Sequence, residues 1–456
     1  MKQRIVIIGG VAAGPKIAAK LLRTKSFDCE VHLYTEEDMI SYSGCGMPYY
    51  IEGMIEESEK LIVRTPEQFE EKGAHIHLKK RCIKIIPKEK KVLMLDLETN
   101  EIETVEYDKL AITTGARPFI PNIENVHLKN IFKLRRLQDS INIRNAIKKA
   151  KHAVIIGGGY MGVELLEAFA ANCLHITLIE RTSHILSIFD EDFSELIVKN
   201  ILEMTKEKSN VEILTSETVI AFEGDKKVER VITASGQVIE TDLVVLAVGI
   251  VPNTEIAKNA GIELGINNTI RVNNRMETSI KDIYAAGDCV ENYNIISKQH
   301  VWTPLGSVAN KQGRCAAVNI AGGYDTFAGV LGSGVTRFMN FSMSLTGLSE
   351  KDARKSGFET ISATLTQKDR AGYMPQAQSI TMKLVVDRRT EKILGAQAIG
   401  FGDADKRINT VASVIMANQN LSDLYNLDMT YSPPYSTSID PLHSLVLMIY
   451  GKLRRS

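Results

Sequence analysis

Apolar residues near the N-terminus gather in short runs separated by a glycine-rich turn. Residues 4–8 are mostly isoleucine and valine, which predicts a buried strand of a parallel sheet. The turn at 9–14 is followed by a helical pattern at 16–24 and by a second apolar run at 30–34. This order predicts a strand–turn–helix–strand unit of the kind that binds a nucleotide, although an ordinary tight turn would give the same local pattern.

The same unit occurs a second time further along the chain. Residues 153–156 predict a strand, 157–162 a glycine turn, 163–172 a helix and 176–179 the next strand. Two such units imply two nucleotide sites and an α/β fold.

Two further apolar runs, at 108–121 and 241–253, predict strands that return the chain from one layer to another. The part after residue 325 alternates a strand pattern at 380–386 with a helical pattern at 405–418, and it carries no nucleotide motif. We therefore expect boundaries near residues 117, 247 and 325.

Composition narrows the class of protein. A chain of 456 residues suffices for about three domains, and its 44% of hydrophobic residues is ordinary for a globular protein. Its 55 basic and 55 acidic residues cancel, which argues against nucleic acid or an anionic membrane as partner. Six unpaired cysteines and the lack of a signal or transmembrane segment favour a cytoplasmic location.

The first turn departs from the regular dinucleotide pattern. Gly9 and Gly14 occupy the outer glycine positions, but Val11 stands at the middle one. Glycines allow the backbone to approach a pyrophosphate, which the N-terminus of the following helix also attracts. The acid that would bind the ribose is displaced by one position, because Thr35 stands where it is expected and Glu36 follows.

The second turn is regular, with Gly157, Gly159 and Gly162 in the three glycine positions. Glu180, at the end of the next strand, suits the ribose hydroxyls of NADH. Arg181 follows directly and could instead bind the 2′-phosphate of NADPH, so both nucleotides remain open.

A cysteine without a partner carries the candidate chemistry. Cys45 lies in the segment 41–49, and the next cysteine is Cys82. A dithiol mechanism needs two neighbouring cysteines, so we expect Cys45 to act as a single sulfur, through a mixed disulfide or a sulfenic acid. The cysteine spacing predicts no metal site.

Together these motifs resemble the pyridine nucleotide–disulfide oxidoreductase superfamily over essentially the whole chain. The resemblance implies a glutathione reductase-like α/β fold with two Rossmann-like domains, for FAD and NAD(P), and a C-terminal α+β dimerisation domain. The implied domains are 1–117 with 247–325 for FAD, 118–246 for NAD(P)H and 326–456 for dimerisation. Ala286-Gly287-Asp288 supplies the aspartate expected at the flavin ribityl chain.

Within this superfamily the segment around Cys45 looks like the single-cysteine branch. Tyr431-Ser432-Pro433-Pro434-Tyr435 and Gly372-Tyr373-Met374-Pro375 are similar to tyrosine–proline signatures of coenzyme A-disulfide reductases. The resemblance implies that Tyr373 and Tyr431 of a partner subunit flank the reactive sulfur, whereas the alternative is that both are ordinary packed tyrosines. Oxidases and peroxidases of the branch carry a histidine where this chain has Ala12, which favours thiol transfer.

The resemblance also assigns residues to the ligands. Cofactor contacts are implied for Ser41, Cys82, Thr114, Gly115, Tyr160, Glu164, Gly249, Asp288, Pro304, Leu305 and Tyr431. Tyr160 is expected to move aside for the nicotinamide, which Glu164 would orient. Substrate contacts are implied for Ser41, Asn310 and the cations Lys16, Lys20 and Arg23, which a helix would place on one face, although a solvated face has the same pattern.

The function that we expect is FAD-dependent reduction, by NAD(P)H, of coenzyme A disulfide or a related small disulfide in a homodimer. Electrons would pass through the flavin to Cys45, whose pKa the flavin and a helix N-terminus would lower. The alternatives are a coenzyme A persulfide or polysulfide reductase and an NADH oxidase or peroxidase using a sulfenic acid. An electron-transfer or signalling flavoprotein, in which Cys45 is incidental, is the alternative of a different class.

Overall fold

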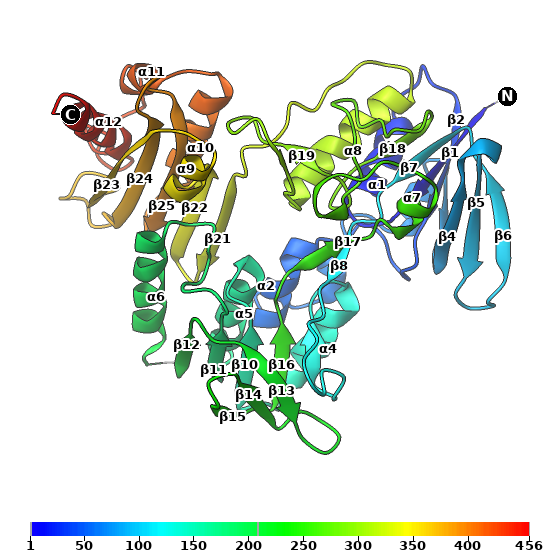
Figure 1. Ribbon diagram of the computed structural model, residues 1–456, viewed down its shortest axis with the longest axis horizontal. Coiled ribbons are helices and arrows are strands. Elements are labelled where there is room, and N and C mark those ends of the chain that lie inside the picture. The colour runs from blue at the N-terminus through cyan, green and yellow to red at the C-terminus, as the bar shows by residue number, and fades with distance from the viewer. Residues whose placement is uncertain (1, 208, 456) are drawn as a thin grey trace.

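The computed structural model describes residues 2–207 and 209–455. It has three lobes (Figure 1), each built on its own sheet. The N-terminal lobe lies at the upper right of Figure 1, the central lobe below it and the C-terminal lobe at the upper left. We use these three names throughout.

The N-terminal lobe is built on a parallel sheet in the order β18-β7-β1-β2-β3. Its strands are β1 (Gln3–Ile8), β2 (Cys29–Tyr34), β3 (Ala74–His77), β7 (Lys109–Ile112) and β18 (Ile283–Ala285). The helices α1 (Ala13–Leu21) and α8 (Gly306–Ile320) cover one face, and an antiparallel sheet covers the other: β4 (Lys80–Ile86), β5 (Lys91–Asp96) and β6 (Ile102–Glu106).

Side chains along β1 point alternately to the two faces of the sheet, so successive residues contact different layers. Ile5 and Ile7 pack with the helices, whereas Val6 and Ile8 pack toward the antiparallel sheet, and all four are buried. The remaining elements of this lobe are short: η1 (Gly44–Gly46), α2 (Met47–Glu52), η2 (Ser58–Leu61), α3 (Pro66–Glu70), η3 (Pro87–Glu89), α7 (Glu255–Asn259), η4 (Ile266–Asn268), β19 (Asn292–Tyr293) and β20 (His300–Val301).

The first helix differs from its predicted bounds. It begins at Ala13 rather than residue 16, because Pro15 is tolerated in a first helical turn. It ends at Leu21 rather than residue 24, so Arg23 lies beyond the last helical residue and does not continue the helical face of Lys16 and Lys20.

The central lobe repeats the parallel design with strand order β12-β11-β10-β16-β9. Its strands are β9 (Ile131–Lys133), β10 (His152–Ile156), β11 (His175–Ile179), β12 (Val211–Leu214) and β16 (Leu243–Leu246). Its helices are α4 (Leu137–Ile147), α5 (Tyr160–Ala171) and α6 (Glu191–Thr205). A small antiparallel sheet completes it: β13 (Val219–Glu223), β14 (Arg230–Thr233) and β15 (Val238–Glu240).

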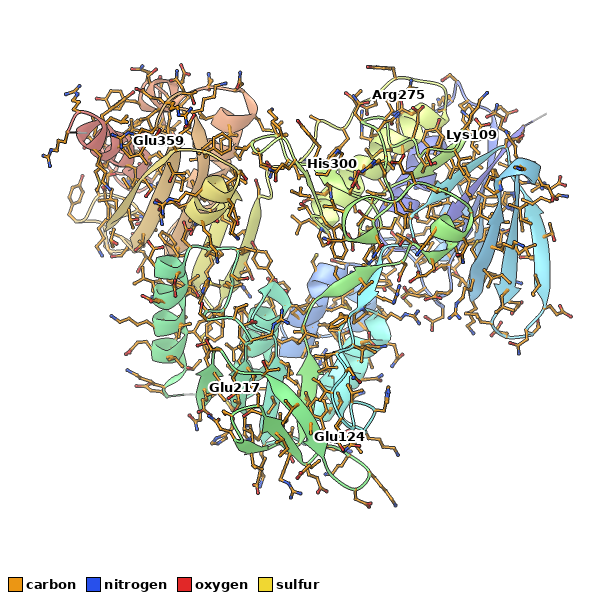
Figure 2. All side chains as sticks on the ribbon, in the orientation of Figure 1. Lys109, Glu124, Glu217, Arg275, His300 and Glu359 are labelled. Carbon is orange, nitrogen blue, oxygen red and sulfur yellow. The ribbon has the colours of Figure 1, made fainter. Side chains whose placement is uncertain are left out.

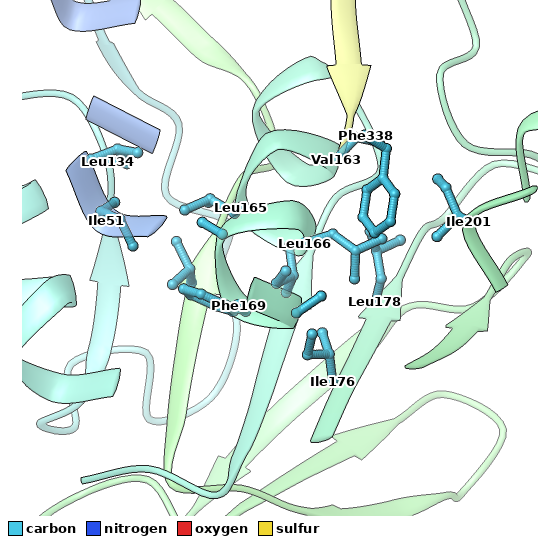
Figure 3. Close-up of a cluster of buried hydrophobic side chains, with 14 of the residues drawn as sticks. Ile51, Leu134, Val163, Leu165, Leu166, Phe169, Ile176, Leu178, Ile201 and Phe338 are labelled. Atoms are coloured by element: carbon cyan, nitrogen blue, oxygen red, sulfur yellow. The ribbon is translucent and has the colours of Figure 1, made fainter. Parts of the chain in front are cut away.

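Helix α5 is the packing centre of this lobe. Leu165, Leu166 and Phe169 are fully buried. In Figure 3, Leu166 lies on the side of Leu178 in β11, whereas Leu165 lies on the side of Ile51. Ile51 of α2 and Phe338 of the C-terminal lobe join the same apolar cluster. Helix α5 therefore connects all three lobes through one core.

Two short strands join the first two lobes. β8 (Ala116–Pro118) and β17 (Ile250–Pro252) pair antiparallel where the chain leaves β7 and β16. This pairing confirms the prediction that the runs 108–121 and 241–253 carry the chain between layers.

The C-terminal lobe has an antiparallel sheet in the order β21-β22-β25-β24-β23. Its strands are β21 (Gly334–Phe338), β22 (Phe341–Gly347), β23 (Thr360–Lys368), β24 (Ser379–Asp387) and β25 (Ile393–Gly400). Its helices are α9 (Glu350–Lys355), α10 (Ala404–Met416), α11 (Leu421–Tyr425) and α12 (Pro441–Leu453). No described helix is long and apolar enough to cross a membrane.

Candidate active site

The loop that carries Cys45 is fixed to the first glycine turn through Ser41. The amide of Ser41 donates to the carbonyl of Gly10 at 2.7 Å, and the carbonyl of Ser41 accepts from the amide of Val63 at 2.8 Å. Ser41 has a φ of +55°, a left-handed conformation that a residue with a side chain seldom adopts. These two bonds hold the strained residue and set the path of the chain toward Cys45.

Cys45 lies in η1, immediately before α2 and next to the N-terminus of α8. The thiol is exposed, and a Cβ atom at Gly306 would lie 3.8 Å from its sulfur. All six cysteines are free, and Cys82, the next one along the chain, is buried in β4. Cys45 is therefore an accessible sulfur without a cysteine partner among the described residues.

The protein groups around Cys45 disfavour the thiolate, whereas the prediction was that the flavin and a helix N-terminus lower its pKa. Desolvation raises the pKa of the Cys45 thiol, and the carboxylates of Glu164 and Asp288 raise it further. Arg135 lowers it, but less. The prediction considered the flavin and a helix N-terminus and missed these two acids, and the effect of the flavin stays a prediction.

The first glycine turn fits a dinucleotide. Gly9 has a φ of +113°, and a Cβ atom there would lie 2.1 Å from the carbonyl oxygen of Thr113. A Cβ atom at Gly14 would lie 2.0 Å from the carbonyl oxygen of Gly9. Glu36, at the end of β2, pairs with Arg81 and Arg136. The turn thus has the tight form that brings a helix N-terminus to a phosphate.

Asp288 is placed at the end of β18 by hydrogen bonds on both sides. The amide of Gly287, whose φ is +89°, donates to Gln312 of α8 at 2.9 Å. The carboxylate of Asp288 accepts from Arg135 at 2.9 Å, and its carbonyl accepts from Trp302. Arg135 had no signal in the sequence, since it lies 153 positions away from its partner.

Thr114 and Gly115 lie just before β8 and opposite the end of β17. The hydroxyl of Thr114 donates to the carbonyl of Asn253 at 2.6 Å, and the amide of Asn253 donates to the carbonyl of Gly115 at 2.9 Å. Gly249 has a φ of +106°, which only glycine adopts readily. These bonds hold the segment at Thr114 and Gly115 against the end of β17.

The second glycine turn also fits a dinucleotide. A Cβ atom at Gly157 would lie 2.4 Å from the carbonyl of Ala247, and one at Gly162 would lie 1.9 Å from the carbonyl of Gly157, whereas one at Gly159 would meet nothing within 4 Å. The open space at Gly159 lets a phosphate approach the backbone.

Glu180 holds this turn in shape. Its carboxylate accepts from the amide of Gly158 at 2.6 Å and from the hydroxyl of Thr182 at 2.8 Å. Arg181 next to it is exposed and makes no ion pair with any described residue. Both side chains thus lie beside the second glycine turn, and their contact with a ribose stays a prediction.

Helix α5 also meets the C-terminal lobe, which the sequence analysis did not foresee. The hydroxyl of Tyr160 is buried without a hydrogen-bond partner among the described residues, and a Cβ atom at Gly334 would lie 2.3 Å from it. Thr336 donates to Glu164 at 3.3 Å. Burial raises the pKa of Glu164 to about 6.

A second contact of the same kind involves the helix after Cys45. The guanidinium of Arg337 lies 5.1 Å above the ring of Tyr49 in α2, and 3.6 Å from Glu167 in α5. Burial raises the pKa of Glu167 to about 7. β21 therefore reaches α2, the helix that follows Cys45.

Tyr373 and Tyr431 lie at the surface of the C-terminal lobe. Their exposed fractions are 76% and 54%, and no described contact joins either of them to Cys45 of the same chain. Tyr373 lies in the β23–β24 hairpin loop and Tyr431 in the loop between α11 and α12. A role at Cys45 would require a second subunit.

The predicted substrate residues lie along α1 and α8, which pack side by side. Lys16 and Lys20 are half-buried on α1, Arg23 is exposed just past its end, and none makes an ion pair with a described residue. Asn310 on α8 donates to the carbonyl of Gly306 at 2.9 Å. Pro304 and Leu305 lead into this helix, and Leu305 is its N-cap.

Comparison with known proteins agrees with this architecture. The family model described as "Pyridine nucleotide-disulphide oxidoreductase" matches residues 3–313, and the dimerisation domain of the same family matches residues 334–442. The two lobes with parallel sheets lie within the first match, and the antiparallel lobe corresponds to the dimerisation domain. The chain belongs to the pyridine nucleotide–disulfide oxidoreductase family, and this membership implies FAD and NAD(P)H as cofactors.

Three relatives show the range of activities. An NAD(P)H coenzyme A polysulfide/persulfide reductase of Pyrococcus horikoshii is 36% identical over 97% of each chain. An NADH oxidase of Methanocaldococcus jannaschii is 33% identical over 96% of this chain and 97% of its own. A coenzyme A disulfide reductase of Staphylococcus epidermidis is 28% identical over 95% and 96%.

Among solved structures, the reduced CoADR-RHD of Bacillus anthracis matches with a TM-score of 0.95 and 33% identity, over 100% of this chain and 81% of that one.

Proposed function

We propose that this enzyme uses NAD(P)H and FAD to reduce coenzyme A disulfide, or a related small disulfide, through the single sulfur of Cys45. The observation that carries the proposal is the accessible thiol of Cys45, which has no cysteine partner among the described residues and lies beside the N-terminus of α8. A flavoprotein that reduces disulfides through its own dithiol would need a second cysteine at this place.

FAD, when bound, supplies the two-electron relay between the nicotinamide and the sulfur. The candidate residues for holding it are Gly9, Gly14 and Glu36 at the dinucleotide end, and Thr114 and Asp288 at the ribityl end. The tight turn and the polar groups at the sheet edge support this assignment.

The nucleotide site is proposed at the second turn, with Gly157, Gly159 and Gly162 beneath the pyrophosphate. Glu180 accepts from the ribose hydroxyls and gives a preference for NADH. The buried hydroxyl of Tyr160, which has no described partner, supports the proposal that this ring moves when the nicotinamide binds. Glu164 would then orient the nicotinamide.

Cys45 performs the sulfur chemistry. Its thiolate attacks one sulfur of the disulfide, forms a mixed disulfide and releases the first thiol as a thiolate. Reduction of the mixed disulfide by two electrons releases the second thiol and restores the Cys45 thiolate. Each released thiolate takes up one proton, and we propose the hydroxyl of the partner's Tyr431 as the donor, assisted by the partner's Tyr373.

The cations Lys16, Lys20 and Arg23 are proposed to bind the phosphates of coenzyme A, with Asn310 and Ser41 as polar contacts. Their lack of carboxylate partners among the described residues supports this proposal, because the two half-buried cations, Lys16 and Lys20, and the exposed Arg23 are free to bind an anionic ligand.

Steady-state turnover with coenzyme A disulfide, coenzyme A persulfide, polysulfide and peroxide, measured side by side, tests the proposal. We expect the highest kcat/KM with coenzyme A disulfide. A clear preference for the persulfide would assign the same site to sulfane-sulfur reduction, the activity in the name of the Pyrococcus horikoshii relative. A preference for peroxide, with a one-oxygen adduct on Cys45, would contradict thiol transfer.

A further inference from the structure

The two loops that carry the exposed tyrosines are anchored by buried polar residues. Tyr373 and Tyr431 cannot be oriented by their own packing, since most of each side chain is exposed. At the base of the hairpin loop, by contrast, Asp369 is only 1% exposed, and Arg407 of α10 beneath it is only 3% exposed. The orientation of the two tyrosine side chains therefore depends on the buried residues that anchor their loops.

Asp369 closes the hairpin loop. Its backbone amide donates to the carbonyl of Gln378 at 2.9 Å, and its carboxylate accepts from the amide of Gln378 at 2.8 Å. The same carboxylate accepts twice from Arg370, at 2.9 and 2.6 Å. Nε and Nη2 of Arg370 thus share one oxygen, Oδ2, of Asp369, which fixes the direction of the guanidinium.

Arg407 joins the bases of both loops. Its Nη2 donates to the carbonyl of Asp369 at 2.7 Å. Its Nε donates to the two carboxylate oxygens of Asp440 at 3.2 and 3.1 Å. Asp440 ends the second loop, because it caps α12 through the amide of Leu442 and also accepts from Ser436 at 3.0 Å.

The loops are also bonded directly, near the tyrosines. The amide of Ala371, two residues before Tyr373, donates to the carbonyl of Pro433 at 3.3 Å. Nη1 of Arg370 donates to the carbonyl of Pro434 at 3.1 Å. Pro433 follows Tyr431 by two residues, so each tyrosine lies two positions from a bond between the loops.

We propose that Arg370 and Arg407 are positioning residues that hold the two tyrosine loops as one rigid unit, presented to the partner's Cys45. The inference rests on the proposed role of the tyrosines. A planar guanidinium can bond two loops at fixed angles, whereas a lysine or glutamine at either position reaches only one of them. If the two loops are no longer held together, the hydroxyls of Tyr373 and Tyr431 are misplaced, while the N-terminal and central lobes are unchanged.

A double-mutant cycle tests this inference in the full-length holoenzyme. Arg370→Gln is introduced into the wild type and into the Tyr373→Phe/Tyr431→Phe double variant. We expect kcat for disulfide reduction to fall about tenfold in the wild-type background and less than about twofold in the phenylalanine background. NADH-driven reduction of ferricyanide, which bypasses the sulfur, should stay at the wild-type rate.

Arg388→Gln is the matched control. Arg388 follows β24 at the end opposite to the tyrosine loop and pairs with Glu359, which Figure 2 labels in the C-terminal lobe. We expect no change in kcat for this variant. Arg407→Lys, which keeps the buried charge, should reproduce the effect of Arg370→Gln.

The possible outcomes distinguish the positioning role of Arg370 from the role of the tyrosines. If Arg370→Gln lowers kcat equally in both backgrounds, the positioning role is overturned while the role of the tyrosines stands. If the phenylalanine variant itself keeps wild-type kcat, the tyrosines are not involved, and both the proposed proton donor and the positioning role are overturned.

Discussion

The loop of Cys45 and the loops of Tyr373 and Tyr431 are built in opposite ways. The cysteine loop is tied to its own chain at the junction of two lobes, through Ser41 and the helix α2. The tyrosine loops are tied to each other through Arg370 and project from the C-terminal lobe without a described contact to that cysteine.

The comparison shows which chemical group each loop lacks. Cys45 has an accessible sulfur, but desolvation and the carboxylates of Glu164 and Asp288 raise its pKa. No described contact joins it to Tyr373 or Tyr431 of its own chain. The tyrosines have hydroxyls but no sulfur. A dimer in which each subunit supplies one half would complete both, and the predictions below test this division.

Replacing the sulfur should have the largest effect. Cys45→Ser should keep its flavin and lose disulfide reduction by about 100-fold or more, since no second cysteine can take over. Flavin absorbance and steady-state turnover measure both quantities. Turnover above one-tenth of the wild-type rate would contradict a single-sulfur mechanism.

Mass spectrometry of the isolated protein sharpens this prediction. Treatment with a phosphine should release about one small thiol per subunit, identified by its mass as coenzyme A, and none from Cys45→Ser.

Removing the proposed proton donor should have the next largest effect. Tyr431→Phe should lower kcat about tenfold, because water is a poorer acid than a positioned phenol, and Tyr373→Phe should lower it less. Flavin content and the dimer mass should not change. An equal loss in flavin content would instead indicate a structural role.

Cofactor choice should change by a similar factor. Glu180→Gln removes the charge that repels a 2′-phosphate, so the ratio of kcat/KM for NADPH to that for NADH should rise about tenfold. Arg181→Ala should move the ratio in the opposite direction. Equal use of the two nucleotides by the wild type would mean that Arg181 outweighs Glu180.

The smallest effect concerns the acidity of the cysteine. Because the carboxylate of Glu164 raises the pKa of Cys45, Glu164→Gln should lower that pKa and leave more thiolate at neutral pH. Alkylation by iodoacetamide, followed against pH in reduced protein without nucleotide, should therefore be faster in the variant. Glu167→Gln, one turn further along α5, is the control and should change the rate less. A slower reaction in Glu164→Gln would contradict the assigned cause.

The parts of the fold that were predictable depend on local patterns. Both glycine turns, the strands beside them and the lone Cys45 follow from runs of neighbouring residues, so their types were correct even where bounds differed, as at Ala13 and Leu21. The connecting strands β8 and β17 could also be predicted, because two apolar runs of the sequence end in similar turns.

The surroundings of the site could not be predicted in this way. Thr336 reaches Glu164 across 172 positions, and no local pattern in β21 signals that contact. The raised pKa of Cys45 has the same origin, because it depends on desolvation and on two acids, Glu164 and Asp288, that lie far from Cys45 in the sequence. The roles of Tyr373 and Tyr431 stay predictions, because they depend on a second subunit.

Mixed dimers test the central claim most directly. One subunit carries Cys45→Ser and the other carries Tyr373→Phe/Tyr431→Phe, with different affinity tags so that heterodimers can be purified and verified by mass. If the tyrosines act across the interface, the heterodimer has one intact site and should regain about half of the wild-type turnover per dimer, well above either parent. Turnover no higher than half that of the phenylalanine parent would place the tyrosines in the same subunit as their cysteine, or outside the mechanism.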